Sequence, residues 1–276
     1  MEHPEELLKK RIFRTVSRCC PYEEAGIAFS GGVDSSLLAL TCVELNKDVT
    51  LITVGFPESP DVKWSKIASS RLNLKHLVKE LSLNDLENAL KYVSSIVKFT
   101  NPIELELSIA FYLICDFAKE KGINIILSAQ GADELFCGYD KYRSAMERGG
   151  KEEVTKLIHE CLNQAFRDRD RANTIARHLG IKLAHPFLEQ DFIEFCLSIP
   201  VELKMSGPDD QLRKRIWRNV AIEIGVPEEI ALKHKKALQY GSGIHKNLVK
   251  IARKWGFSGK GCLTRLVSYL MKRANV

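Results

Sequence analysis

The chain has 276 residues, a formal net charge of +6, 45% hydrophobic residues and 28% charged residues, a composition typical of a globular protein with a real core. No apolar run approaches the roughly 18 residues of a membrane helix, and the amino terminus is charged rather than signal-like, so we expect a cytoplasmic protein with no membrane segment. The eight cysteines form no CxxC pair, which argues against a zinc or iron–sulfur centre.

The first half of the chain alternates between strand-like and helix-like segments. The expected strands cover 26–29, 49–56, 76–81 and 123–130, and the expected helices cover 35–45, 63–72, 83–97 and 103–120. This alternation predicts an α/β fold, with a parallel sheet covered by helices on both faces. Ligands of such sheets bind beyond the carboxyl ends of the strands.

The second half is expected to be α-helical. After Tyr139 the sequence is charged and helix-forming, especially over 146–179, and we expect no further strand. The turn at 148–150 marks a plausible boundary. From Ile230 onward the chain has no Asp or Glu but many Lys and Arg. Such a stretch attracts anions, among them ATP, pyrophosphate, an acidic substrate or RNA, although for the last twenty residues we favour a merely solvated helix face.

The most informative motif is SGGVDSS at residues 30–36, which lies between an apolar strand and an apolar helix. Phosphate is favoured where a strand meets a helix amino terminus. Gly31 and Gly32 are expected to adopt positive φ, so that the backbone can approach the ligand closely. Ser30, Ser35 and Ser36 offer hydroxyl donors. The alternative is a simple strand-to-helix connection.

Two aspartates suggest a magnesium site. Asp34 lies within the phosphate-type loop, and Asp133 follows the strand at 123–130. Both loops are expected at the same sheet edge, and two carboxylates with phosphate oxygens suit Mg²⁺. Taken alone, the Asp133–Glu134 pair fits equally well a helix start favoured by the helix dipole.

Five segments together resemble the synthetase domain of asparagine synthetase, in the PP-loop or N-type ATP pyrophosphatase superfamily. They are SGGVDSS, VGFPESPD (54–61), LSAQGADELFCGYDKY (127–142), HPFLEQDFIEFCLSIP (185–200) and KHKKALQYGSG (233–243). The resemblance implies an adenine nucleotide alpha hydrolase-like sheet, with an ATP-binding PP-loop domain at 1–145. A helical, basic region at 146–276 would complete the site. In that family ATP adenylates aspartate and ammonia displaces AMP, whereas the related β-lactam and carbapenam synthetases close a ring.

The resemblance also implies roles for individual residues. Pyrophosphate would lie against Ser30, Gly31, Gly32, Ser35 and Ser36, and Mg²⁺ would bind Asp34 and Asp133. Adenine would contact Val54 and Gly55, and Gly131 would pack against the nucleotide. Lys235 matches the family lysine that stabilises charge on the α-phosphate. Glu134, His185 and Arg218 are weaker candidates, and His185 fits a core loop better.

The chain departs from the family pattern at three points. Only residues 1–25 precede the first predicted strand, so we expect a stand-alone form without a glutaminase domain. Gln130 lies where asparagine synthetases carry Glu and β-lactam synthetase carries Tyr, and a neutral amide cannot act as a general base. Cys137 replaces a usual Gly and is interpreted as a reactive thiol, a sulfur carrier or, preferably, a residue without a role.

These observations favour an ATP-dependent, AMP-forming ligase that uses ATP and Mg²⁺. Its substrate would be a small carboxylate such as aspartate, and its nitrogen would come from ammonia, a separate glutaminase subunit or another amine. The main alternative is a tRNA-modifying enzyme that adenylates a base and transfers sulfur or an amine, which only the basic carboxyl-terminal stretch and Cys137 support. A non-catalytic nucleotide-binding protein is the third interpretation. A homo-oligomer is possible, nucleic acid is a possible but not favoured partner, and no membrane partner is expected.

Overall fold

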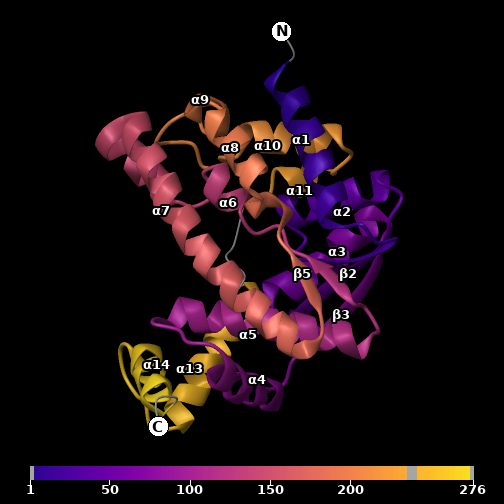
Figure 1. Cartoon of the computed structure of the whole chain (residues 1–276). Coiled ribbons are helices and arrows are strands. Elements are labelled where there is room, and N and C mark those ends of the chain that lie inside the picture. The colour runs from indigo at the N-terminus through magenta and orange to yellow at the C-terminus, as the bar shows by residue number, and fades with distance from the viewer. Residues whose placement is uncertain (1–2, 235–240, 274–276) are drawn as a thin grey trace.

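The computed structural model describes residues 3–234 and 241–273 (Figure 1). The elements of the first half are α1 (Pro4–Cys19), β1 (Glu24–Ala28), α2 (Val33–Glu44), β2 (Asp48–Gly55), α3 (Pro60–Leu72), β3 (Lys75–Glu80), α4 (Leu83–Ile96), α5 (Pro102–Glu120), β4 (Ile125–Leu127) and α6 (Ala132–Leu135). Those of the second half are α7 (Lys141–Leu179), β5 (Lys182–Ala184), a 3₁₀ turn (Pro186–Leu188), α8 (Gln190–Ser198), α9 (Val201–Lys204), α10 (Arg215–Glu223), α11 (Glu228–Ala231), α13 (Ile244–Lys254) and α14 (Cys262–Arg273).

The strands form one parallel sheet in the order β3-β2-β1-β4-β5. β1 lies in the middle, so the loop that follows it leaves the sheet between two neighbours. The expectation of no strand after Tyr139 is wrong, because β5 pairs in parallel with β4 from Ile125↔Lys182 to Leu127↔Ala184. The three residues of β5 are too few to show an apolar pattern in the sequence.

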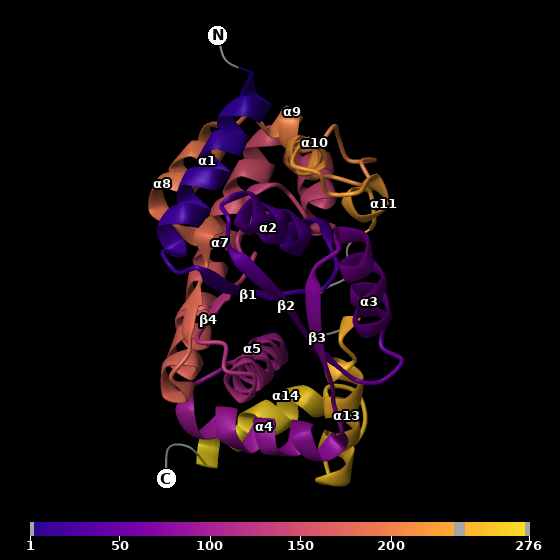
Figure 2. The same cartoon turned by 90° about the vertical axis from the view of Figure 1, so that its right-hand side faces the viewer.

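Helices cover both faces of the sheet, as the sequence predicts (Figure 2). On one face the strands pack against α2 and α3, with α1 and α10 behind α2. On the other face α5 lies on the sheet, and α4, α13 and α14 lie outside α5. Side chains along β4 alternate between the two faces of the sheet. Ile125 and Leu127 pack in the core on the α2 and α3 face, and Ile126 packs in the core on the α5 face. The α/β class predicted from the sequence is therefore confirmed.

The long helix α7 crosses the molecule diagonally and is bent near its start (Figure 1). Non-helical angles occur at Gly149 and Gly150, and Gly150 has φ of 63°. Two consecutive glycines without side chains allow this break. The break falls at the predicted turn, whereas the division into domains at residue 145 stays a prediction.

The basic carboxyl-terminal helices pack through apolar faces. Ile244, Leu248 and Ile251 of α13 and Leu266 of α14 are buried against the layer formed by α4 and α5. Their charged residues face outward, and Lys254 pairs with Glu87 at 2.8 Å. Among the described residues, no helix has both the length and the apolar character needed to cross a bilayer.

Candidate functional site

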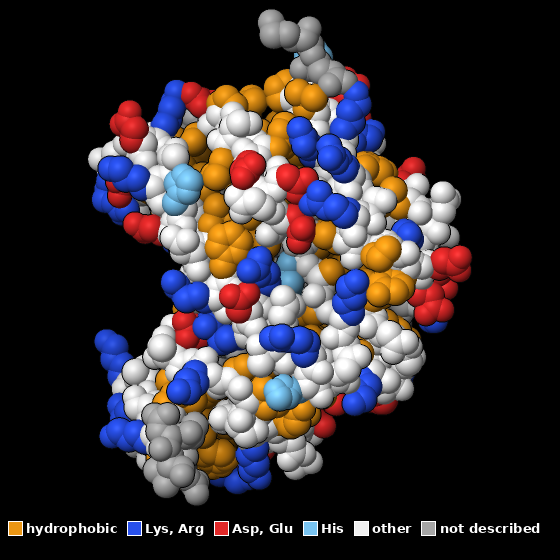
Figure 3. All heavy atoms as spheres, in the orientation of Figure 1, with side chains coloured by type: hydrophobic (Ala, Val, Ile, Leu, Met, Phe, Trp, Pro, Cys, Tyr) orange, Lys and Arg blue, Asp and Glu red, His pale blue; other side chains and the backbone are white. Residues whose placement is uncertain are grey.

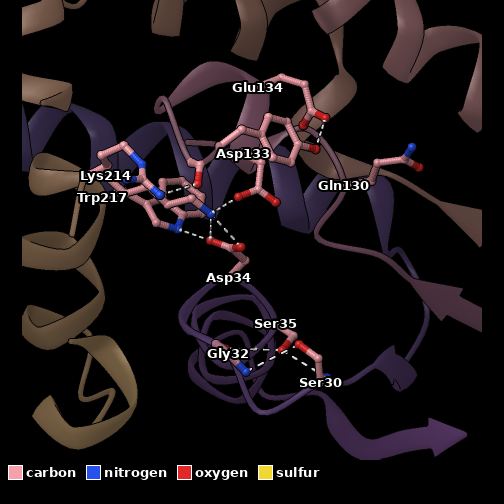
Figure 4. A network of polar contacts seen from close by, with 12 residues as sticks. Ser30, Gly32, Asp34, Ser35, Gln130, Asp133, Glu134, Lys214 and Trp217 are labelled. Carbon is pink, nitrogen blue, oxygen red and sulfur yellow. Dashed lines mark hydrogen bonds and ion pairs between the residues drawn. The ribbon is translucent and has the colours of Figure 1, made fainter. Parts of the chain in front are cut away.

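The loop after β1 is held by hydrogen bonds between its own serines and its backbone. The Ser30 amide donates to Ser35 Oγ at 3.4 Å, the Gly32 amide donates to Ser30 Oγ at 3.4 Å, and Ser35 Oγ donates to the Gly32 carbonyl at 3.2 Å. Ser36 is fully buried, and its hydroxyl has no partner in residues 3–234 and 241–273. Ser30, Gly32 and Ser35 lie together at the amino terminus of α2 (Figure 4), where a phosphate anion is stabilised.

The structure requires glycine at only the first of the two glycine positions in this loop. Gly31 has φ of 74°, and a Cβ there would lie 2.7 Å from Trp64 Cδ1. Trp64 Nε1 in turn donates to the Gly31 carbonyl at 2.7 Å. Gly32 has φ of −83°, so the expectation of positive φ is correct for Gly31 and wrong for Gly32. A Cβ at Gly32 would lie 3.4 Å from Ser30 Oγ, an ordinary van der Waals contact.

A buried lysine joins the two predicted magnesium ligands (Figure 4). Lys214 Nζ lies 2.7 and 2.8 Å from the carboxylate oxygens of Asp34 and 2.6 Å from Asp133 Oδ1. Trp217 Nε1 also donates to Asp34 Oδ1, at 2.9 Å. The Lys214 side chain is only 1% exposed. The structure thus brings Asp34 and Asp133 to one point, as predicted, and places an ammonium group there.

Gly138 makes room for this ion-pair cluster. A Cβ at Gly138 would overlap Asp133 Oδ1 and Lys214 Cε. The Gly138 amide also donates to the Asp133 carbonyl at 2.7 Å, which fixes the loop after α6. Lys214 has left-handed backbone angles, with φ of 55°, and immediately precedes α10. The side chain thereby enters the site from a segment 180 residues beyond Asp34.

The carboxylate pair has the chemistry of a magnesium site. Asp34 and Asp133 contact the same Nζ atom, so one cation position lies within reach of both, and hard divalent cations prefer such oxygen ligands. No group of three or more Asp, Glu, His or Cys side chains able to hold a metal occurs within the described ranges. A metal here would therefore depend on these two carboxylates and on ligand oxygens, with Lys214 withdrawn from between them.

Gln130 lies beside the cluster but points away from it (Figure 4). The backbone N–H of Gln130 donates to Ser128 Oγ at 3.2 Å. The side-chain Oε1 atom of Gln130 is buried without a partner in the described part of the chain. The next residue, Gly131, has φ of 104°, and a Cβ there would lie 2.6 Å from the Phe187 carbonyl oxygen. The loops after β4 and β5 are therefore in direct contact.

The predicted adenine contact at the end of β2 is closely packed. Val54 is buried, and a Cβ on Gly55 would lie 2.8 Å from Val62 Cγ2, 3.0 Å from Ser59 Oγ and 3.2 Å from the Ser242 carbonyl. The Phe56 amide donates to that same carbonyl at 2.9 Å. This contact joins the loop after β2 to the segment before α13. The predicted catalytic residue Lys235 lies outside the described residues.

Arg218 and Glu134 have structural partners. The Arg218 guanidinium donates to the carbonyls of Leu212, Arg213, Ala231 and Lys233, so it ties the loop before α10 to the segment leading to Lys235. Glu134 accepts a hydrogen bond from Tyr139 Oη at 2.6 Å, and burial raises the pKa of its carboxyl group.

Cys137 is fully buried, although it lies only four residues beyond Asp133. Burial raises the pKa of its thiol to about 12, whereas a reactive cysteine is exposed and has a lowered pKa. The structure therefore gives no support to a reactive thiol or a sulfur carrier at this position.

Lys214 is the functional candidate that the sequence analysis missed. It lies in a basic run, QLRKR, at 211–215, which looks like a solvated surface. The sequence pointed to such a lysine only indirectly. Two aspartates that are expected to lie close together need a positively charged partner when no cation is bound.

Replacing Lys214 tests the ion-pair cluster. Lys214→Met would leave two largely buried carboxylates without their shared cation, so we expect a loss of about 3–5 kcal/mol in the free energy of unfolding. Millimolar Mg²⁺ should restore more stability to this variant than to the parent protein. Urea denaturation with and without Mg²⁺ measures both effects.

The control is Lys66→Met, because Lys66 pairs with Glu80 where both side chains are about half exposed. We expect this variant to lose less than about 1 kcal/mol. Equal stability losses for the two lysine variants would contradict a buried, shared ammonium.

Gly138→Ala should disturb the same cluster from the opposite side. The added methyl group would overlap Asp133 and Lys214, so we expect a destabilisation of about 1–3 kcal/mol. Gly207→Ala is the matched control, because a Cβ there has no neighbour within 4 Å. Thermal unfolding of both variants measures the difference, and a neutral Gly138→Ala would show that the cluster tolerates displacement.

Comparison with known proteins gives one consistent family. The family model described as asparagine synthase matches residues 8–169 and 150–260. A Methanocaldococcus jannaschii protein provisionally named asparagine synthetase (glutamine-hydrolyzing) 1 is 32% identical over 291 residues, which cover 94% of this chain and 52% of that protein. Asparagine synthetase (glutamine-hydrolyzing) 3 of Arabidopsis thaliana is 27% identical, over 85% of this chain and 42% of its own length.

The chain thus spans about half the length of the curated relatives it matches. Among solved structures, NMN synthetase from Francisella tularensis aligns with 99% of this chain and 95% of its own at a TM-score of 0.48 and 14% identity, and we draw nothing further from that likeness. The family model matches more than half of the chain, and the chain belongs to the asparagine synthase family.

Proposed function

We propose that the chain is an ATP-dependent ligase that adenylates a small carboxylate, aspartate in the first instance, and transfers nitrogen to it as an amide. The products are AMP, pyrophosphate and the amide. The observation that carries the proposal is the convergence of Asp34, at the start of α2, with Asp133, in the short helix α6, on one cation position. Family membership supports the same reaction class.

Each part of the site has a role in this reaction. Ser30, Gly31, Gly32, Ser35 and Ser36 bind the pyrophosphate portion of ATP at the start of α2. Val54, Gly55 and Gly131 contact the nucleotide. Asp34 and Asp133 hold Mg²⁺, which supplies charge neutralisation to the phosphate oxygens when bound.

Two lysines supply positive charge to the phosphates. Lys214 already lies at the carboxylate pair with its ammonium buried, so it is positioned to meet phosphate oxygens as the nucleotide enters. Lys235, which resembles the family lysine, is proposed to meet the α-phosphate. A fixed ammonium in a closed site stabilises negative charge that develops during attack on phosphorus.

The nitrogen step proceeds without a base at Gln130. A neutral amide cannot remove a proton at pH 7, so the nucleophile must arrive uncharged. Ammonia meets this requirement, whether it comes from solution or from a separate glutaminase. Cys137 does not support the alternative of sulfur transfer to tRNA, because its thiol is buried and burial raises the pKa of that thiol to about 12.

Exchange of radiolabelled pyrophosphate into ATP tests the adenylation step. Exchange should require a carboxylate, with aspartate tried first, and Asp34→Asn and Asp133→Asn should each reduce it by roughly 100-fold or more. The exposed Asp209 gives a matched control, Asp209→Asn, which should keep full exchange. Full exchange in either site variant would refute the magnesium assignment, and exchange that needs tRNA instead of a carboxylate would refute the reaction.

Gln130→Glu tests the nitrogen step separately. A carboxylate at this position supplies the missing base, so ammonia-dependent amide formation should rise about tenfold or more, while pyrophosphate exchange stays unchanged. The isosteric control is Gln211→Glu, at an exposed position. No change in amide formation would place Gln130 away from the nucleophile.

A further inference from the structure

The indole of Trp64 connects α3 to the phosphate-type loop. Trp64 is half-buried near the start of α3, and its Nε1 atom donates a hydrogen bond to the Gly31 carbonyl at 2.7 Å. The ring edge is also close to the loop, since a Cβ on Gly31 would lie 2.7 Å from Trp64 Cδ1 and 3.1 Å from Ala68 Cβ. The positive φ of Gly31 and the place of the indole therefore depend on each other.

This hydrogen bond fixes the direction of the peptide group between Gly31 and Gly32. In a planar trans peptide the carbonyl and the N–H that follows it point in opposite directions. Because the Gly31 carbonyl is turned toward Trp64, the Gly32 N–H is turned away from the indole, and it donates to Ser30 Oγ. Figure 4 shows the Gly32 nitrogen facing the serines of the loop. On that side the amino terminus of α2 stabilises a phosphate anion.

The N–H groups on this side of the loop are only weakly used within the protein. The Gly32 N–H lies 3.4 Å from Ser30 Oγ, and the Ser30 N–H lies 3.4 Å from Ser35 Oγ. Ordinary N–H···O bonds measure roughly 2.7–3.2 Å. A phosphate oxygen, which carries negative charge, accepts a shorter and stronger bond than a hydroxyl group does. Both N–H groups can therefore be transferred to a phosphate at little cost.

The face of the same indole holds a lysine. Lys233 Nζ lies 3.1 Å from the centroid of the Trp64 ring, which is a cation–π contact. The Lys233 carbonyl accepts a hydrogen bond from the Arg218 guanidinium at 3.3 Å, so the backbone at this lysine is held as well. Since one ring makes both contacts, the Lys233 ammonium lies beside the phosphate-type loop. Its positive charge favours an anion there.

We propose that Trp64 is a positioning residue for the pyrophosphate portion of ATP. Its indole N–H holds the Gly31–Gly32 peptide with the Gly32 N–H directed to the phosphate side, and its ring face holds the Lys233 ammonium beside the loop. This inference rests on the proposed function. Trp64 acts through the peptide group and the lysine, so its loss weakens the binding of ATP and leaves the binding of the carboxylate unchanged.

The first test separates the indole N–H from the ring. Trp64→Phe removes the N–H and keeps an aromatic face for Lys233, so KM for ATP in pyrophosphate exchange should rise about tenfold, with no change in KM for the carboxylate. Trp64→His should recover part of this loss at pH 8, because imidazole Nε2 has the ring position of indole Nε1 and donates in one neutral tautomer. The control is Trp255→Phe, at a half-buried tryptophan packed against the core on the α5 face, which should keep the parent KM.

Isothermal titration calorimetry with Mg·ATP measures the same order of affinities without turnover. The Kd should be lowest for the parent and the Trp255→Phe control, intermediate for Trp64→His and highest for Trp64→Phe. A Trp64→Phe protein that melts at a lower temperature but binds ATP as the parent does would make Trp64 a packing residue only, and the proposal would be wrong. Equal affinities of the His and Phe variants would contradict the role of the N–H.

A second test leaves the tryptophan in place, so it does not depend on the folding of the Trp64 variants. Lys233→Met should raise the Kd for Mg·ATP several-fold and weaken its dependence on salt. Lys63→Met is the control, because Lys63 adjoins Trp64 in the sequence and is an exposed residue that pairs with Glu58. Equal affinity of the Lys233→Met variant and the parent would overturn the assignment of the lysine. A parent protein that binds ATP but shows no exchange with any carboxylate would refute the proposed function instead.

Discussion

The ion-pair cluster of Lys214 with Asp34 and Asp133 is the interaction on which the rest of the site depends. Its three side chains come from the first turn of α2, from α6 and from the residue directly before α10. Two carboxylates this close and this buried repel each other unless a cation lies between them. Lys214 is that cation in the described structure. The same contacts hold the second half of the chain against the carboxyl ends of the strands.

The order of the strands arranges the remaining parts of the site in one line. From β2 through β1 and β4 to β5, the strand ends carry the predicted adenine contact, the phosphate-type loop, the second aspartate and finally the weaker candidate His185. The protein surface is indented between the upper end of α7 and the lobe that contains α14, and both basic and acidic side chains lie around the indentation (Figure 3).

The sequence was sufficient for the features that depend on local pattern. The Gly31–Gly32 turn and the alternating apolar segments predicted the sheet and the phosphate-type loop, because buried parallel strands and strand-to-helix turns have direct sequence signatures. It was insufficient where tertiary contacts decide. β5 is a strand only because it pairs with β4, and Lys214 is buried only because Gly138 leaves space for it. His185 resembled a core residue until its two ring nitrogens proved to lack partners in the described chain.

The central claim is that this site cleaves ATP between the α- and β-phosphates by attack of a carboxylate. The most direct measurement uses aspartate labelled with ¹⁸O in its side-chain carboxylate, with ammonia and Mg·ATP, followed by ³¹P NMR of the nucleotide products. The claim predicts that one ¹⁸O atom appears in the phosphate of AMP, together with unlabelled pyrophosphate. Formation of ADP with label in inorganic phosphate, or of AMP without label, would contradict it.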